Sequence, residues 1–295
     1  MTIDATSVGE LVQSQAAKRT RGRVKRIFRN SAYLESASGL VLLLRGPLRS
    51  PMTVNLVAGT HLQQALSVGE RFELEPAKLG VGELEIGLSN ARVFRSGLAG
   101  TRKIRVMSEE RIVKSATALK LLYSASESAF DLVKGQAFDG LVGSLLRPLS
   151  SGRFSPAYRL QTYQGLIGSG TGFTPAGDDI IAGFTAAFNL YARSTGKKQI
   201  SLPVAELKRR TVPESALLVD YAQRGYVDET LQGLILAGLD GRPSVFRAHL
   251  SELASRGHTS GLDMSLGVLL MLACASDIAR RGSALESFLM ELRDC

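Results

Sequence analysis

The spacing of hydrophobic and polar residues changes about a third of the way along the chain. Over the first hundred residues, short apolar segments alternate with polar positions and are separated by Gly and Pro. Residues 32–36 and 40–44 flank Ser38-Gly39, a pattern that is typical of a β-hairpin. Further short strands are expected at residues 23–28, 53–57, 71–75 and 84–88. Strands at this spacing predict a small β-barrel or a β-sandwich.

From about residue 107 onward, apolar residues recur every three or four positions, which is the period of an amphipathic helix. Ser108 can cap a first helix that carries Ile112, Ala116, Leu119 and Tyr123 on one face. Further helices are expected at residues 127–134, 136–147, 179–194, 213–224, 228–239, 243–256, 261–280 and 283–293. We therefore predict an α+β protein with a β-rich domain of residues 1–106 and a larger, mostly α-helical domain of residues 107–295. The basic stretch 95–106 is the expected boundary.

The composition is that of an ordinary globular protein, with 44% hydrophobic and 21% charged residues in a chain of 295. The longest apolar run, residues 266–275, contains Gly267 and is shorter than a membrane span. An apolar secretory leader is not visible at the N-terminus, so we expect a cytoplasmic protein without a membrane partner. The two cysteines, Cys274 and Cys295, are expected to be free thiols in a reducing compartment.

The net charge of +9 is concentrated in two basic runs, at residues 18–29 and 92–105. Runs of this kind can bind nucleic acid, but no aromatic platform and no known nucleic-acid-binding module accompanies them in the sequence. We interpret them instead as a basic surface that attracts small anionic substrates or an acidic partner. Nucleic-acid binding is the less favoured alternative.

The most distinctive segment is a glycine-rich loop that leads into a predicted helix. It reads Gly-Ser-Gly-Thr-Gly-Phe-Thr-Pro-Ala-Gly-Asp-Asp from residue 168 to 179. Such a loop exposes backbone N–H groups beside the positive end of the helix dipole, where proteins bind phosphate or carboxylate groups. The segment has neither the lysine of a Walker A loop nor the spacing of a dinucleotide fingerprint; the alternative to a ligand site is a structural turn. The candidate anion-binding residues are Gly168, Gly170, Thr171, Gly172, Thr174 and Gly177.

A second segment repeats part of this pattern. Residues 257–263 read Gly-His-Thr-Ser-Gly-Leu-Asp, and both segments contain Gly-x-Asp-x-x-x-Gly, once from Gly177 to Gly183 and once from Gly261 to Gly267. If the two helix starts converge, hydroxyl and N–H groups from both would surround one anion. A glycine at this offset can also be only a helix-packing contact. The second segment and the loop between the two add these candidate binding residues: Arg210, Thr259, Ser260 and Gly261.

Three carboxylates and one histidine are the candidates for chemistry at this site. Asp178, Asp179 and Asp263 can hold a Mg²⁺ ion or orient an N–H group of the substrate. His258 is the only histidine within either segment and is a candidate acid or base, although a histidine at a helix start can also serve only as a cap. Arg210 is a candidate anion clamp because guanidinium groups bind carboxylate and phosphate in a forked geometry.

The segment from Gly168 to Asp179 is similar to the signature of a bacterial family that includes the AllH subunit of oxamate carbamoyltransferase. Residues 210–215 and 257–263 also fit that family. The resemblance implies transfer of a carbamoyl group between oxalurate and phosphate in allantoin and purine breakdown. It also implies a hetero-oligomer with other subunits, one of them related to acyl-CoA synthetases. Two alternatives stay open: a non-catalytic metabolite-sensing or assembly subunit, and an ATP- or CoA-linked ligase component.

Overall fold

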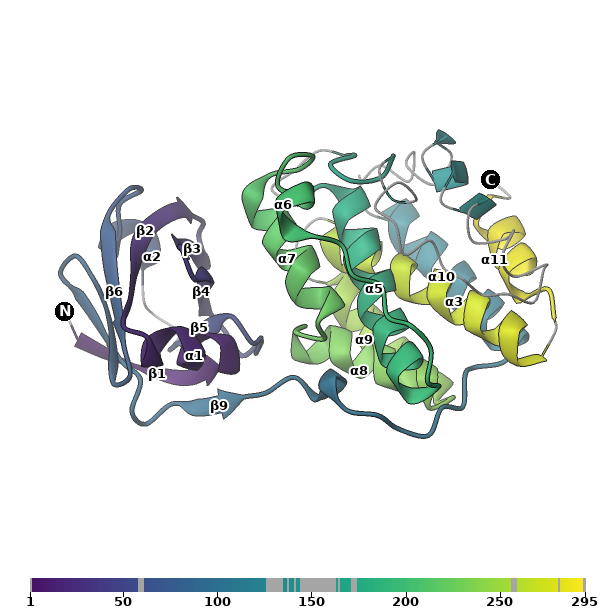
Figure 1. Ribbon diagram of the computed structural model, residues 1–295, viewed down its shortest axis with the longest axis horizontal. Coiled ribbons are helices and arrows are strands. Elements are labelled where there is room, and N and C mark those ends of the chain that lie inside the picture. Colours follow the sequence, from purple (N-terminus) through teal and green to yellow (C-terminus); the bar gives the residue numbers. More distant parts are fainter. Residues whose placement is uncertain are drawn as a thin grey trace. The chain divides into compact units, whose positions relative to one another are not determined.

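The protein is an α+β protein of two compact units, as the sequence predicts (Figure 1). The computed structural model describes residues 2–57, 61–125, 135–136, 138–140, 142–143, 163, 165–170, 174–255, 259–280 and 282–293. The first unit comprises Met1–Ser96 and Val227–Glu229, and the second comprises Gly97–Tyr226 and Thr230–Cys295.

The first unit is a closed barrel of eight strands with mixed directions. The strands are β1 (Thr2–Gly9), β2 (Thr20–Ile27), β3 (Ser31–Ser36), β4 (Gly39–Arg45), β5 (Thr53–Leu56), β6 (Arg71–Glu75), β7 (Lys78–Val81) and β8 (Leu84–Gly87). They follow the order β5-β4-β3-β2-β6-β7-β8-β1, and β1 also pairs with β5, which closes the barrel. A ninth strand, β9 (Arg92–Phe94), runs parallel to β1. Of the two predicted architectures, the barrel is therefore the correct one.

The barrel contains a helix, α1 (Glu10–Ala17), that the sequence analysis does not predict. Its apolar residues Val12 and Ala16 belong to the barrel core. Gln15 is buried as well and donates from Nε2 to the Leu40 carbonyl oxygen at 3.1 Å. The helix has only eight residues, half of them polar, so its sequence carries little periodic signal. Its position depends on these tertiary contacts with the barrel. A second short helix, α2 (Leu62–Ala65), was missed for the same reason.

The second unit is helical, and most of its helices lie within a few residues of the predicted ranges. The described elements are η1 (Gly97–Ala99), α3 (Glu109–Ala125), α5 (Ala176–Ser194), α6 (Val204–Leu207), α7 (Pro213–Gln223), α8 (Glu229–Leu239), α9 (Pro243–Ala254), α10 (Ser260–Arg280) and α11 (Ala284–Arg293). The predicted helix 127–134 lies outside the described residues. Half of the predicted helix 136–147 does so too, and its described residues, 136, 138–140 and 142–143, are helical.

Residues that the sequence analysis treats as a boundary are attached to the helical unit. The Arg105 N–H donates to the Leu239 carbonyl oxygen at 2.7 Å, and the Met107 N–H donates to that of Gly238 at 3.2 Å. Backbone hydrogen bonds therefore tie this segment to the end of α8. The compact helical unit accordingly begins at Gly97, which lies within the expected boundary stretch 95–106 and ten residues before residue 107, the predicted start of the helical domain.

Helices α5 and α10 form the centre of the helical unit and lie side by side (Figure 1). A Cβ atom placed on Gly183 of α5 would lie under 3.0 Å from the Met264 carbonyl oxygen of α10. A Cβ atom on Gly267 of α10 would lie under 3.0 Å from the carbonyl oxygen of Ile180 on α5. The two backbones can approach this closely only because both positions are glycine. This crossing fixes the first turns of the two helices beside each other.

Helix α10 is, among the described residues, one helix that is long and apolar enough to cross a membrane. No segment of that length is expected from the sequence, because the uninterrupted apolar run, residues 266–275, is shorter than the whole helix. In its most apolar window 78% of the residues are buried within the fold. Burial of this extent is equally the property of the central helix of a packed bundle, which is the position of α10 here.

Candidate functional site

The two Gly-x-Asp-x-x-x-Gly segments meet at the N-terminal ends of α5 and α10. Thr174, two residues before α5, and Ser260, the first residue of α10, lie with their hydroxyl oxygens 2.9 Å apart. The predicted convergence of the two helix starts is therefore confirmed. Two helix N-termini therefore lie close together, and the dipole of each helix favours negative charge at this end.

The two segments also share their packing. A Cβ atom on Gly177 would lie under 3.0 Å from the Leu166 carbonyl oxygen, and a Cβ atom on Gly261 equally close to that of Leu253. Each first glycine thus packs a helix start against the backbone of a preceding segment. The second glycines, Gly183 and Gly267, lie at the crossing of α5 and α10. The interpretation of these two glycines as helix-packing contacts is therefore correct. The aspartates that the segments share occupy equivalent positions in the two first turns.

Asp178 has a structural role. Its side chain is 1% exposed. Oδ1 accepts a hydrogen bond from the Gly168 N–H at 2.9 Å, and Oδ2 accepts from the Ser215 hydroxyl at 2.6 Å and from the Thr211 hydroxyl. One carboxylate therefore joins the glycine loop, the loop after α6 and the first turn of α7. Its lone pairs are used within the protein.

Substitution of Asp178 with asparagine is expected to lower the free energy of unfolding by about 2–3 kcal/mol, because an NH₂ group would face donors in place of an acceptor oxygen. Urea denaturation followed by circular dichroism measures the change. Asp240→Asn, at a partly exposed position between α8 and α9, is the matched control. A loss no larger than that of the control would show that this network does not hold the loop.

Asp179 is buried beneath the two hydroxyl groups. Its Oδ2 accepts a hydrogen bond from the Thr174 hydroxyl at 2.9 Å, and its side chain is almost fully buried. Burial raises the pKa of this carboxyl well above its ordinary value, and the charges of Asp263 and Asp178 act in the same direction. Hydrogen bonds from Ser260 and Thr174 oppose the rise in pKa. The surroundings therefore favour the neutral acid.

Asp263 holds the equivalent position on α10. Its Oδ1 accepts a hydrogen bond from the Tyr123 hydroxyl at 2.6 Å. Burial raises the pKa of Asp263 to about 6, although hydrogen bonds from Tyr123 and Thr259 lower it. Thr259 is thus close enough to affect the pKa of the Asp263 carboxyl. Among the residues that the structure describes, however, none is placed to form a hydrogen bond with Asp263 Oδ2. A buried carboxylate oxygen without a donor is unusual and needs an explanation.

The sequence analysis did not identify Tyr123 as part of the site. It placed this residue on the apolar face of α3, where the ring is indeed buried. Burial, and secondarily the nearby charge of Asp263, raises the pKa of the Tyr123 hydroxyl well above its ordinary value, so this hydroxyl remains a donor. A tyrosine at an apolar helical position needs a partner for its hydroxyl, which is a weak signal that could have been used.

The remaining candidates are placed as follows. Gly168 and Gly170 have φ values of 77° and 103°, which favour glycine, so the loop requires both. The main-chain carbonyl of Arg210 lies against Gly168, and Arg210 itself is exposed. Its predicted role as an anion clamp stays a prediction. Three candidates lie outside the described residues: Thr171, Gly172 and His258.

The candidate Mg²⁺ site at the three aspartates receives no support from the geometry. Across the described part of the chain, no three His, Cys, Asp or Glu side chains come together in a way that could hold a metal ion. Asp178 already accepts three hydrogen bonds, and the pKa of Asp179 is raised well above its ordinary value, which favours the neutral acid over a metal-binding carboxylate.

Cys274 is a free thiol, as expected, and is buried within α10. Burial raises its pKa, which disfavours the reactive thiolate form. The other cysteine, Cys295, lies outside the described residues.

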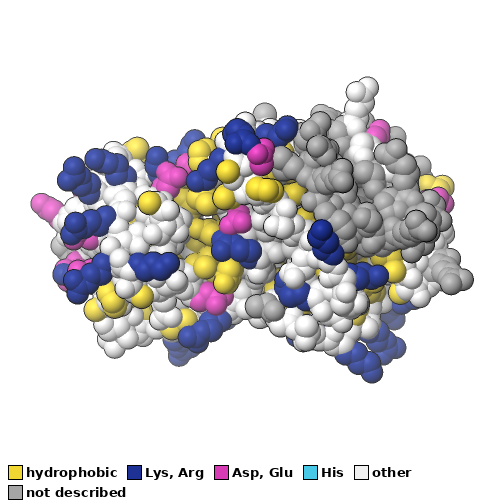
Figure 2. All heavy atoms as spheres, in the orientation of Figure 1, with side chains coloured by type: hydrophobic (Ala, Val, Ile, Leu, Met, Phe, Trp, Pro, Cys, Tyr) yellow, Lys and Arg dark blue, Asp and Glu magenta, His cyan; other side chains and the backbone are white. Residues whose placement is uncertain are grey.

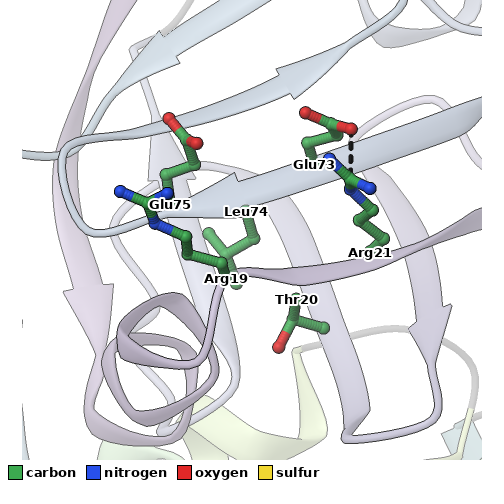
Figure 3. A pocket seen from close by; sticks show the side chains of 6 residues that line it. All are labelled: Arg19, Thr20, Arg21, Glu73, Leu74 and Glu75. Carbon is green, nitrogen blue, oxygen red and sulfur yellow. Dashed lines mark ion pairs between the residues drawn. The ribbon is translucent and has the colours of Figure 1, made fainter.

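The barrel surface carries a separate, shallow pocket between β2 and β6 (Figure 3). It is lined by Arg19, Thr20, Arg21, Glu73, Leu74 and Glu75. Arg21 Nε lies 2.7 Å from Glu73 Oε1, but both side chains are more than half exposed, so this ion pair contributes little energy. Figure 2 shows Lys and Arg side chains on the visible face of this unit, interspersed with Asp and Glu. The role of the basic runs in attracting anions stays a prediction.

Comparison with known proteins gives one match. Residues 166–272 match the family model described as oxamate carbamoyltransferase subunit AllH. This range contains the glycine loop, residues 210–215 and residues 257–263, on which the resemblance rests, so the resemblance is confirmed for this part of the chain. The barrel lies outside the matched range. No curated protein and no solved structure matches the chain.

Proposed function

We propose that the chain is a subunit of a carbamoyltransferase that moves a carbamoyl group between a small carboxylate, of the oxamate and oxalurate type, and phosphate. The observation that carries the proposal is the meeting of the α5 and α10 starts within the range that matches the AllH family. The family is described as a subunit of an enzyme, so we also propose that other subunits complete the enzyme, in the cytoplasm.

The chemistry of the substrates agrees with the site. Carbamoyl phosphate and oxamate are small anions that also carry N–H groups. The phosphate or carboxylate would lie against the N-terminal ends of α5 and α10, beside the Gly168–Gly170 loop. Thr174 and Ser260 supply hydroxyl groups at the same place. Donors that are fixed in advance would stabilise the charge that develops on the carbonyl oxygen during transfer.

Calorimetric titration with carbamoyl phosphate tests this proposal. We expect the wild type to bind it and Asp179→Leu to bind at least about tenfold more weakly, because the substitution removes the carboxyl group that anchors Thr174 beside Ser260. Leucine has a similar volume and is apolar, so the buried position should accept it, and a thermal melt checks that the variant folds. Asp240→Leu is the control at a partly exposed position.

Two outcomes would contradict the proposal. If the wild type binds neither carbamoyl phosphate nor oxamate, the chain does not carry the substrate site. If Asp179→Leu binds as tightly as the wild type, the site lies elsewhere. Binding without turnover, once the partner subunits are added, would favour the metabolite-sensing alternative.

A further inference from the structure

The hydroxyl groups of Thr174 and Ser260 lie together at the two helix starts, and each has only one proton to donate. Thr174 donates its one proton to Asp179 Oδ2, so the bond between Thr174 and Ser260 uses the proton of Ser260. Ser260 also lowers the pKa of Asp179, which a hydroxyl does by donating to the carboxylate, so its one proton serves either Asp179 or Thr174. A closed ring of three hydrogen bonds, with Asp179 donating to Ser260, is possible only when Asp179 is the neutral acid.

Asp263 has no such ring. Its Oδ1 accepts from Tyr123, and its Oδ2 is buried without a partner among the described residues. The residue as a whole is 4% exposed. The neighbouring Thr259 and Ser260 are half-buried, so this first turn of α10 reaches the protein surface. One acceptor oxygen is therefore left for a ligand that enters at the helix start.

The surroundings decide which kind of donor suits this oxygen. The N-terminal ends of α5 and α10 favour an anion, whereas the carboxylate of Asp263 itself favours a hydrogen-bond donor. The described residues also offer no further side chains to complete a metal site. A neutral N–H on an otherwise anionic ligand satisfies both conditions. A carbamoyl group attached to a carboxylate or a phosphate has this combination.

We propose that Asp263 Oδ2 accepts an N–H of the ligand's carbamoyl group and thereby distinguishes a carboxamide from a ligand that has a methyl group in the same place. The inference rests on the proposed function for the identity of the anion. The contact that distinguishes the two ligands is assigned to Asp263, whereas Asp179 holds the neighbouring hydroxyl groups in place.

Oxamate and pyruvate provide the test, because they have the same charge and nearly the same shape but differ in NH₂ against CH₃. Calorimetry at pH 8 compares their affinities in the wild type and in two substitutions at equivalent positions, Asp263→Asn and Asp179→Asn. We expect the wild type to prefer oxamate by at least about tenfold, since a site built to bind an N–H rejects the analogue that lacks it.

Asp263→Asn is expected to remove this preference. Tyr123 needs an acceptor, so it fixes the amide oxygen at the Oδ1 position and places the NH₂ group where Oδ2 was. Two N–H donors would then face each other, and the affinity for oxamate should fall at least about tenfold, while that for pyruvate changes little. Asp179→Asn can keep the ring, with its oxygen accepting from Thr174 and its NH₂ group donating to Ser260. It should therefore keep the preference, whatever its effect on both affinities.

The outcomes separate the two proposals. A wild type that binds carbamoyl phosphate but does not distinguish oxamate from pyruvate overturns this inference and leaves the proposed function in place. So does an Asp263→Asn variant that still prefers oxamate. A wild type that binds none of the three ligands overturns both. Asp263→Leu, which removes the acceptor without adding a donor, must also lose the preference and provides a second test if Asp263→Asn does not fold.

Discussion

Gly267→Ala is expected to destabilise the helical unit by more than about 4 kcal/mol or to prevent its folding. The added methyl group would lie under 3.0 Å from the Ile180 carbonyl oxygen and from the Phe184 amide nitrogen. Both are backbone atoms of a helix that is buried along nearly its whole length, so neither can move without moving α5. The gain in helix propensity from glycine to alanine, about 1 kcal/mol, is too small to offset this overlap.

Chemical denaturation followed by the helical circular dichroism signal measures this effect. Gly80→Ala is the control, because a Cβ atom there meets no neighbouring atom within 4 Å. A free energy of unfolding of Gly267→Ala close to that of the control would show that α5 and α10 do not cross as closely as described.

The reciprocal contact gives a sharper form of the same test. Gly183→Ala should be about as harmful as Gly267→Ala, because its Cβ atom would overlap the Met264 carbonyl oxygen. Both overlaps are relieved by the same movement, the separation of the two helices. The double variant should therefore cost less than the sum of the two single variants. Additive costs would mean that the two glycines do not belong to one crossing.

The larger part of this fold could be predicted from local sequence patterns. The long helices are visible because their apolar residues recur at helical spacing over ten residues or more. The convergence of the two helix starts could be predicted because Gly-x-Asp-x-x-x-Gly occurs twice, and equivalent segments tend to pack in equivalent ways. The sequence narrows the β-rich unit to a barrel or a sandwich but does not decide between them. Closure into a barrel depends on the pairing of β1 with β5 and β8, and these strands are far apart in the sequence.

The different roles of the three aspartates could not be predicted from the sequence. Asp178 and Asp179 are adjacent in the sequence, yet successive helical residues point in different directions, so one faces Ser215 and the other faces Thr174. The sequence therefore suggests a paired carboxylate where the structure has one structural anchor and one member of a hydroxyl ring. Tyr123, the partner of Asp263, comes from a helix 140 residues away, and local patterns carry no information about such a contact.

Asp263→Asn is expected to change how stability depends on pH. In the folded wild type the pKa of Asp263 is about 6, against an ordinary value of 3.8. The folded state thus binds this proton more tightly than the unfolded state. The stabilisation from the bound proton is complete below about pH 4 and is lost as the pH rises through about 6. A shift of roughly two pKa units corresponds to about 3 kcal/mol, to order of magnitude.

Asparagine cannot lose this proton, so the variant should lack this part of the pH dependence. Its buried NH₂ group adds a cost, but that cost is the same at every pH and cancels when two pH values are compared. The free energy of unfolding of Asp263→Asn minus that of the wild type should therefore be larger at pH 8 than at pH 4, by up to about 3 kcal/mol. Asp179 is present in both proteins, so its own raised pKa contributes to the two curves in the same direction.

Urea denaturation at pH 4 and pH 8 measures this difference, with Asp240→Asn as a control that should give parallel curves. A constant offset between wild type and Asp263→Asn would mean that Asp263 is already paired with a donor in the folded protein, and the argument for a ligand N–H at Oδ2 would lose its basis. A pH-dependent offset that disappears when oxamate is added would instead show that the ligand supplies the missing donor. The stability measurement and the ligand preference thus examine the same oxygen atom by independent means, because one needs no ligand and the other does not depend on unfolding.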